Sequence, residues 1–127
     1  MRSRSRVRWD ELREAVLQRD LYQSWWRSED RIHHGVPFDR WRTSPRTSCV
    51  ARFLDPSGSG PCSGRLTLDH VKDEPMMGKK APDDEQHLVS LCERHHLDTV
   101  AGSNWATSHR PLLRLYLKEI RLDRTVE

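Results

Sequence analysis

The fold of this chain is decided by the stretch His87-Leu-Val-Ser-Leu-Cys92-Glu-Arg-His95-His96, together with an earlier pair, Asp69-His70. An apolar run of strand length leads from His87 into Cys92, and polar residues follow it. Two residues separate Cys92 from His95, which is the spacing of a knuckle that clamps zinc where a strand turns into a helix. The stretch therefore predicts a strand, a helix and a metal site at the turn between them.

Further helices and strands are expected on either side of this stretch. The segments 49–54 and 65–71 read as short strands, and a polar loop with two prolines spans residues 72–86. A helix is predicted from Glu93 to about Val100, closed by Gly102. Apolar side chains at helical spacing predict a first helix over residues 9–20. A last helix is predicted by the apolar residues Leu112, Leu113, Tyr116, Leu117 and Ile120.

These elements divide a chain of 127 residues, the size of one domain, into four parts. Residues 1–8 are expected to form a basic flexible arm, because arginines this dense repel one another. Residues 9–48 would hold the N-terminal helix and an insertion rich in arginine and tryptophan. Residues 49–103 would form a strand, loop, strand and helix core, and residues 104–127 a C-terminal helix. The predicted class is α+β.

The charge of the chain favours a polyanionic partner. Residues 1–52 carry twelve arginines against seven acidic residues, and arginine outnumbers lysine 18 to 4 in the whole chain. A guanidinium binds phosphate with two parallel hydrogen bonds, so this bias fits contact with nucleic acid. A genome rich in G and C would produce the same bias without any role in binding. The aromatic residues of the insertion could likewise stack on bases or pack on the domain.

Composition also limits the redox state and the location of the protein. The count of three cysteines is odd and does not make a closed disulfide framework. No signal peptide and no apolar run of membrane-spanning length is visible in the sequence. We therefore expect a cytoplasmic protein that has no membrane partner and whose thiols are reduced and free to bind metal. Because only 35% of the residues are hydrophobic, a structural metal would help to stabilise so thin a core.

Two metal sites are predicted from these residues. Zinc in a structural site takes four ligands, and the first predicted set is Cys49, Cys62, Cys92 and His95, although Cys49 could instead be a small buried apolar residue. Asp69 and His96 are the predicted ligands of a second, divalent ion, and His70 would act beside it as a base. Neighbours on a regular strand face opposite sides, so Asp69 and His70 can serve one site only where the strand bends or ends.

Asp69-His70, His87-Leu88, Leu91-Cys92 and His95-His96 together resemble the motif of the HNH endonucleases, which runs roughly DH, then NLxxLC, then CH. The resemblance covers residues 49–97. Residues 9–20 also resemble the leading helix of small HNH proteins, and residues 104–113 resemble the tail of short HNH proteins encoded by phages. It implies a ββα-metal fold with flanking helices and a structural zinc ion. This chain has His87 where the family usually has asparagine, and His95 where it usually has the last cysteine of the zinc site.

The resemblance assigns His70 as the general base and Asp69 and His96 as ligands of one catalytic divalent ion. That ion would be Mg²⁺ or Mn²⁺, with Ni²⁺ and Zn²⁺ as alternatives. His87 would brace the loop and orient the base. For contacts with DNA, the basic residues close in sequence are the candidates, namely Lys79, Lys80, Arg94 and Arg110.

The function expected from the resemblance is metal-dependent hydrolysis of phosphodiester bonds in DNA. In a phage setting, the partners would be DNA and the terminase or other packaging proteins, inside the bacterial host. One alternative is a zinc-stabilised DNA-binding module without catalysis, which needs the cysteines but not Asp69. Another alternative is an accessory subunit of a larger DNA-processing machine.

Overall fold

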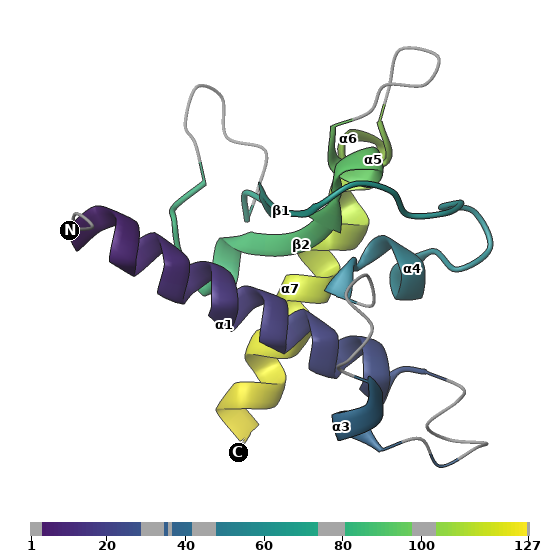
Figure 1. Ribbon diagram of the computed structural model, residues 1–127, viewed down its shortest axis with the longest axis horizontal. Coiled ribbons are helices and arrows are strands. Elements are labelled where there is room, and N and C mark those ends of the chain that lie inside the picture. The colour runs from purple at the N-terminus through teal and green to yellow at the C-terminus, as the bar shows by residue number, and fades with distance from the viewer. Residues whose placement is uncertain are drawn as a thin grey trace.

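A two-stranded antiparallel sheet lies among helices in the computed structural model of the protein (Figure 1). The structure describes residues 4–28, 35, 37–41, 48–73, 81–97 and 104–126. The helical elements are α1 Arg4–Trp26, α3 Phe38–Trp41, α4 Ala51–Leu54, the 3-10 helix η2 Glu85–His87, α5 Glu93–His96, α6 Trp105–Ser108 and α7 Arg110–Val126. The strands are β1 Leu66–His70 and β2 Leu88–Cys92. The protein is therefore a small α+β structure, as the sequence predicted.

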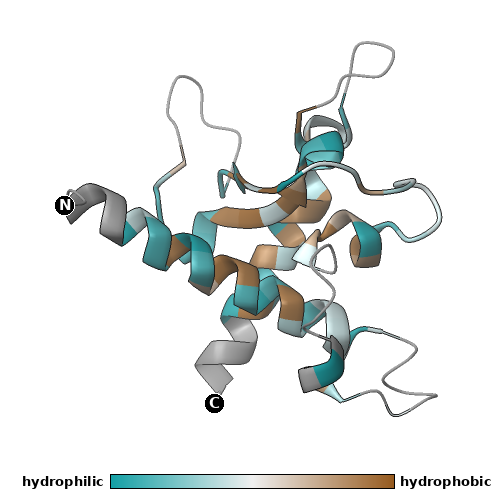
Figure 2. Ribbon diagram, in the orientation of Figure 1, coloured by the Kyte–Doolittle hydropathy of each residue, from teal (hydrophilic) through white to brown (hydrophobic). Residues whose placement is uncertain are grey.

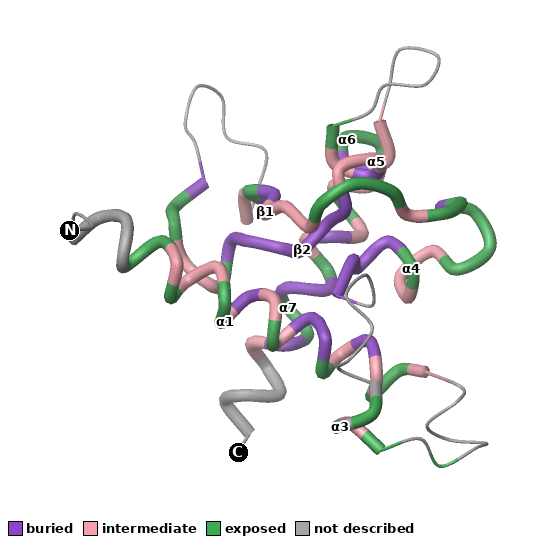
Figure 3. Tube along the Cα trace, viewed as in Figure 1, coloured by how far each residue is buried: buried purple, intermediate pink, exposed green. Residues whose placement is uncertain are grey.

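The sheet joins the two segments that carry the candidate metal residues. Its register sets Asp69 opposite Val89 and Thr67 opposite Leu91. Every residue of β2 is buried, whereas β1 is covered less completely (Figure 3). A strand, a connection, a second strand and helix α5 follow one another as predicted, although residues 74–80 and 98–103 lie outside the described part of the chain.

Helix α7 supplies much of the core. Its buried side chains are Leu113, Tyr116, Leu117 and Ile120. They belong to one apolar cluster with Val71, Val89 and Leu91 of the sheet region. Hydrophobic colour runs along β2 and along parts of α1 and α7, while the exposed turns of α1 are hydrophilic (Figure 2). The apolar stripe predicted for the last helix is thus confirmed as core.

Helix α1 is fixed to β2 by a buried carboxylate. Asp20 is fully buried and accepts hydrogen bonds from the backbone N–H of Ser90 at 2.7 Å and from the hydroxyl of Tyr116 at 2.6 Å. The guanidinium of Arg19 donates to the same carboxylate at 2.9 Å and to the carbonyl oxygen of Leu88 at 2.6 Å. One acidic residue thereby joins α1, β2 and α7.

Replacing Asp20 by alanine is expected to lower the free energy of unfolding by about 3 kcal/mol, because a buried cation and two buried donors would lose their acceptor. Chemical denaturation followed by circular dichroism measures this change. The matched variant is Tyr116→Phe, which removes one donor and leaves the carboxylate in place. Tyr116→Phe should lower the free energy of unfolding by about half as much as Asp20→Ala does. Equal stability of Asp20→Ala and the wild type would contradict this role for Asp20.

One predicted strand is a helix. The segment 49–54 contributes a single backbone hydrogen bond to β2, from the N–H of Val50 to the carbonyl of Ser90, and then turns into α4. An apolar run this short fits a strand and a buried helical turn equally well by its periodicity. The backbone hydrogen bonds decide between them, since the N–H of Leu54 donates to the carbonyl of Val50 at 2.9 Å and that of Asp55 to the carbonyl of Ala51 at 3.0 Å.

The first described helix begins inside the segment predicted as a basic arm, of which residues 1–3 lie outside the described part of the chain. Helix α1 begins at Arg4 and so includes five of the eight residues assigned to the arm. Arginine is a good helix former, and a helix anchored downstream can extend through several arginines. Much of the insertion predicted within residues 9–48 lies outside the described residues. Within the described part of the chain, no helix combines the length and the apolar character that crossing a membrane requires.

Candidate functional site

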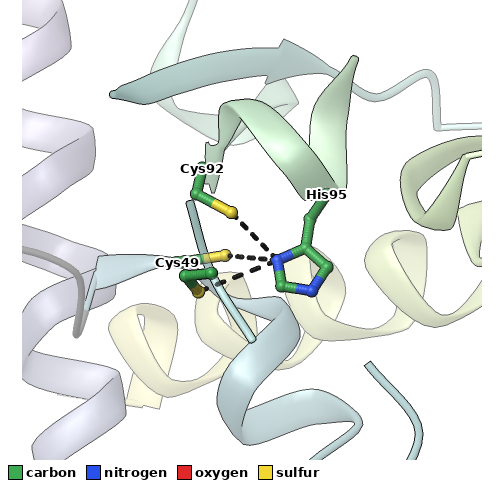
Figure 4. A group of neighbouring side chains, drawn as sticks. Cys49, Cys92 and His95 are labelled. Atoms are coloured by element: carbon green, nitrogen blue, oxygen red, sulfur yellow. Dashed lines mark hydrogen bonds between the residues drawn. The ribbon is translucent and has the colours of Figure 1, made fainter. Parts of the chain in front are cut away.

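Three cysteines and one histidine from separate parts of the chain meet at one point. Cys49 precedes α4, Cys62 lies in the turn before β1, Cys92 ends β2, and His95 lies in α5. The Nδ1 atom of His95 is 3.0 Å from the sulfur of Cys92, 3.5 Å from that of Cys49 and 3.7 Å from that of Cys62. Figure 4 shows Cys49 and Cys92 directed toward this nitrogen. The cluster could hold a metal ion such as zinc.

The spacing of these atoms tests the fit to zinc. The four ligand atoms all lie within 4.8 Å of one another. Sulfur atoms bound tetrahedrally to zinc at about 2.3 Å would be roughly 3.8 Å apart. A contraction of less than about 1 Å would therefore bring the cluster to zinc-binding geometry. Cys49, Cys92 and His95 are buried, so an ion held here would be closed off from water on most sides.

The tautomer of His95 suits a metal ligand. Its Nε2 lies 2.7 Å from the carbonyl oxygen of Ser59 and must donate a proton to it. The lone pair is then on Nδ1, the nitrogen that faces the three sulfurs. Arg94 donates to the same carbonyl at 3.0 Å and to the carbonyl of Pro61 at 2.9 Å, which fixes the turn that carries Ser59. Such outer hydrogen bonds are typical of histidines that bind zinc.

The pKa values of two thiols in the cluster are shifted in opposite directions. A hydrogen bond with Cys49 lowers the pKa of Cys62 to about 5, and the same contact, together with burial, raises the pKa of Cys49. Zinc binds the thiolate form, so one ligand is already charged near neutral pH. Cys62 also lines a surface pocket with Arg52 and Pro61, which gives an ion or a chelator access to the cluster.

Asp69 and His96 form a second pair of possible metal ligands. His96 is the neighbour of His95 on α5. Nε2 of His96 lies 3.3 Å from Oδ1 of Asp69. Thr67, two residues before Asp69 on the same face of β1, donates its hydroxyl to the carbonyl of Leu91 at 2.8 Å. The hydroxyl oxygen of Thr67 therefore accepts a hydrogen bond from Nδ1 of His96, which lies 2.6 Å away and carries the proton. His96 therefore directs Nε2 toward the carboxylate, where that atom can donate a proton or coordinate a cation.

Arg110, the first residue of α7, occupies the other side of the carboxylate. It donates to Oδ2 of Asp69 at 2.5 Å, to Oδ1 at 3.1 Å and to the carbonyl of His70 at 3.0 Å. Burial by itself would raise the pKa of Asp69, but the hydrogen bonds from His96 and Arg110 outweigh it and hold the pKa below its ordinary value. Asp69 is therefore a carboxylate at neutral pH although it is only 4% exposed.

His70 faces away from Asp69 at the end of β1. Its side chain is 42% exposed, while that of Asp69 is 5% exposed, as the alternation of a strand requires. The ring stacks on Trp9 of α1 with centroids 6.3 Å apart, and Nε2 donates to Oδ1 of Asp83 at 2.5 Å. The lone pair is then on Nδ1. Within the described residues, no hydrogen bond joins this ring to Asp69 or His96.

His87 braces the loop with both ring nitrogens. Nδ1 donates to Asp84 at 2.6 Å and Nε2 donates to Asp73 at 2.8 Å. Burial lowers the pKa of His87, but these two hydrogen bonds more than offset it and raise the pKa above its ordinary value. Arg121 donates to the same Asp73 at 2.8 Å. The ring therefore joins the two ends of the loop, and within the described residues its hydrogen bonds go to these carboxylates rather than to His70.

The predicted basic residues differ in where they lie. Arg110 contacts Asp69, whereas Arg94 serves the turn beside the cysteine cluster. Lys79 and Lys80 lie outside the described residues. Sequence reasoning missed Thr67 and Asp83, since a threonine in a strand and an aspartate in a polar loop are too common to be selected by residue type. The alternation of β1 does place Thr67 on the face of Asp69, and that was the one available signal.

Two sites thus arise from side chains distant in sequence. One is the group of three cysteines and His95, of which only Cys62 is partly exposed, and the other is the pair of Asp69 and His96 with Arg110 beside it. No protein-family model, curated protein or solved structure matches the chain.

Proposed function

We propose that the protein is a zinc-braced, metal-dependent endonuclease of the HNH type, which hydrolyses phosphodiester bonds of DNA. The observation that carries the proposal is the pairing of Asp69 with an oriented His96 at 3.3 Å. A carboxylate oxygen and an imidazole nitrogen are a donor set that suits Mn²⁺ and related divalent ions. Thr67 holds the second nitrogen of His96, as outer hydrogen bonds do for histidines that bind metals.

The metal residues and the base would act on opposite sides of the phosphate. An ion held by Asp69 and His96 would neutralise charge on a phosphate oxygen and on the leaving oxygen. Attack on phosphorus is in line, so the attacking water enters opposite the leaving oxygen. His70 is the last residue of β1, so its side chain and that of Asp69 could meet one phosphate beyond the end of this strand. Nδ1 of His70 would take the proton of the attacking water, while Asp83 orients the ring through Nε2.

The cysteine cluster would have a structural role in this enzyme. Zinc bound by Cys49, Cys62, Cys92 and His95 would join the end of β2 to α5 and to the segments before α4 and β1. His96 follows His95 directly on α5, so a rigid zinc site also fixes the position of a ligand of the second ion. A sparse apolar core gains most from such a brace.

Nicking of supercoiled plasmid tests the proposed activity. We expect relaxed circles to accumulate with Mg²⁺ or Mn²⁺ and not with a chelator that removes them. Asp69→Asn keeps the shape of the side chain and removes the charge, so it should reduce the rate by about a hundredfold or more if the carboxylate binds the ion. Zinc content and circular dichroism of the same variant serve as controls. A variant that retains wild-type nicking would contradict the assignment of Asp69.

A second candidate is a DNA-binding module braced by zinc, without catalysis or as a subunit of a larger DNA-processing machine. The observation that favours it is the bidentate pairing of Asp69 with Arg110, since an ion pair alone explains a buried carboxylate. Binding to DNA that is unaffected by Mn²⁺ and by Asp69→Asn, with no nicking, would support this candidate. Nicking that appears only after a partner protein is added would support the subunit.

A further inference from the structure

The Asp69 carboxylate is already neutralised by a cation on both of its oxygens. Arg110 donates to Oδ2 at 2.5 Å and to Oδ1 at 3.1 Å, while Nε2 of His96 lies 3.3 Å from Oδ1. An ion held between Oδ1 and Nε2 would therefore lie close to a guanidinium of the same sign of charge. In a buried site such like charges repel strongly, so a divalent cation competes with Arg110 for this carboxylate.

Arg110 is also the arginine best placed to meet a phosphate group at this site. It holds the carboxylate of Asp69 and the carbonyl oxygen of His70 at once, so it spans the residues proposed for the ion and for the base. Its side chain is 30% exposed, although Asp69 beneath it is buried. Phosphate and carboxylate present similar pairs of oxygens, and the fork of a guanidinium fits both. Arg94, by contrast, is committed to two backbone carbonyls near the cysteine cluster.

We propose that Arg110 is a phosphate-binding residue of this site, which Asp69 holds in place until a divalent ion displaces it. The inference rests on the proposed function, because it takes Asp69 and His96 as the ligands of that ion. An arriving cation takes over the carboxylate, and the released guanidinium turns to a phosphate oxygen beside it. Ion binding and DNA binding then strengthen each other by the same factor, since coupling between two ligands is reciprocal.

Ion affinity gives the first test and requires no catalysis. Mn²⁺ binding to the zinc-loaded protein, followed by electron paramagnetic resonance, should be about tenfold tighter in Arg110→Ala, because the competing charged hydrogen bonds are gone. Arg110→Lys keeps the charge but not the forked guanidinium, so its Mn²⁺ affinity should lie between those of the wild type and Arg110→Ala. The matched control is Arg114→Ala, one turn further along α7, whose side chain donates to the carbonyl of Lys72 and should leave ion affinity unchanged.

DNA affinity gives the second test. In a His70→Ala background, which keeps the DNA intact, Mn²⁺ should tighten duplex binding about tenfold, the value of one added charged contact. Arg110→Ala should abolish this gain and leave binding without Mn²⁺ unchanged. Melting temperatures measured without Mn²⁺ separate this effect from loss of folding, and Arg110→Lys provides a folded alternative if the alanine variant is unstable.

The outcomes separate this inference from the proposed activity. Wild-type Mn²⁺ affinity in Arg110→Ala, or a gain in DNA binding that persists without Arg110, overturns the role of Arg110 even if the protein nicks DNA. Suppose that Arg110→Ala binds Mn²⁺ more tightly and that Mn²⁺ no longer strengthens its DNA binding, while the wild type does not nick DNA. That result supports the role of Arg110 and rejects the nuclease. Mn²⁺ binding that Asp69→Asn does not weaken overturns both.

Discussion

His95→Ala is expected to lose bound zinc and to unfold at ordinary temperature, whereas His96→Ala should keep both zinc and fold. The adjacent histidines have separate partners, because Nδ1 of His95 faces three sulfurs and Nε2 of His96 faces Asp69. A structural zinc site is worth about 10–16 kcal/mol in apparent binding free energy. That amount is as large as the entire stability of a typical domain, about 5–15 kcal/mol.

Zinc content by mass spectrometry and thermal unfolding by circular dichroism measure the difference. His95→Cys should restore zinc binding, because a thiolate also binds zinc. The ligand at position 95 keeps its spacing from Cys92. His96→Ala should in turn lose the Mn²⁺ site that His95→Cys retains. A His95→Ala protein with one zinc ion per chain and a wild-type melting temperature would rule out this histidine as a ligand.

His70→Ala is expected to slow plasmid nicking by about 10²–10⁴-fold with little change in fold, since a positioned general base contributes that much to the rate. The side chain is exposed at the end of β1 and contacts Trp9 and Asp83, so its removal leaves no buried cavity. Asp83→Asn should give a smaller loss of about tenfold, because the base remains while the group that orients it is weakened. Undiminished nicking by His70→Ala would remove this residue from the mechanism.

Residue type and spacing predicted the cysteine cluster and most of the core elements. The two residues between Cys92 and His95 correspond to a strand that ends and a helix that begins, and the structure confirms both. The stripe along α7 was predictable because apolar residues at helical spacing must be buried together. The segment 49–54 was wrongly predicted as a strand, since a run of this length has too few residues for periodicity to select a structure.

Partners of charged groups could not be predicted in the same way. Lys79, Lys80, Arg94 and Arg110 had equal claims by sequence, and only packing separates Arg94 from Arg110. The buried Asp20 and its donor Tyr116 lie on helices at opposite ends of the chain. A hydrogen bond between residues so far apart in the sequence leaves no periodic signal.

The sequence by itself determined which atoms are available for metal chemistry, because the kinds of ligand and their local spacing are fixed by the covalent order of the chain. It placed Cys92 and His95 at one turn, and it placed Asp69 next to His70 on a strand, where alternation sends them to opposite faces. Only the tertiary structure decided which tautomers His95 and His96 adopt and that Arg110 covers Asp69. Those outcomes depend on hydrogen bonds between segments far apart in the chain. Thr67 contacts His96, Ser59 contacts His95, and Arg110 of α7 contacts Asp69, and these contacts set the local electrostatics.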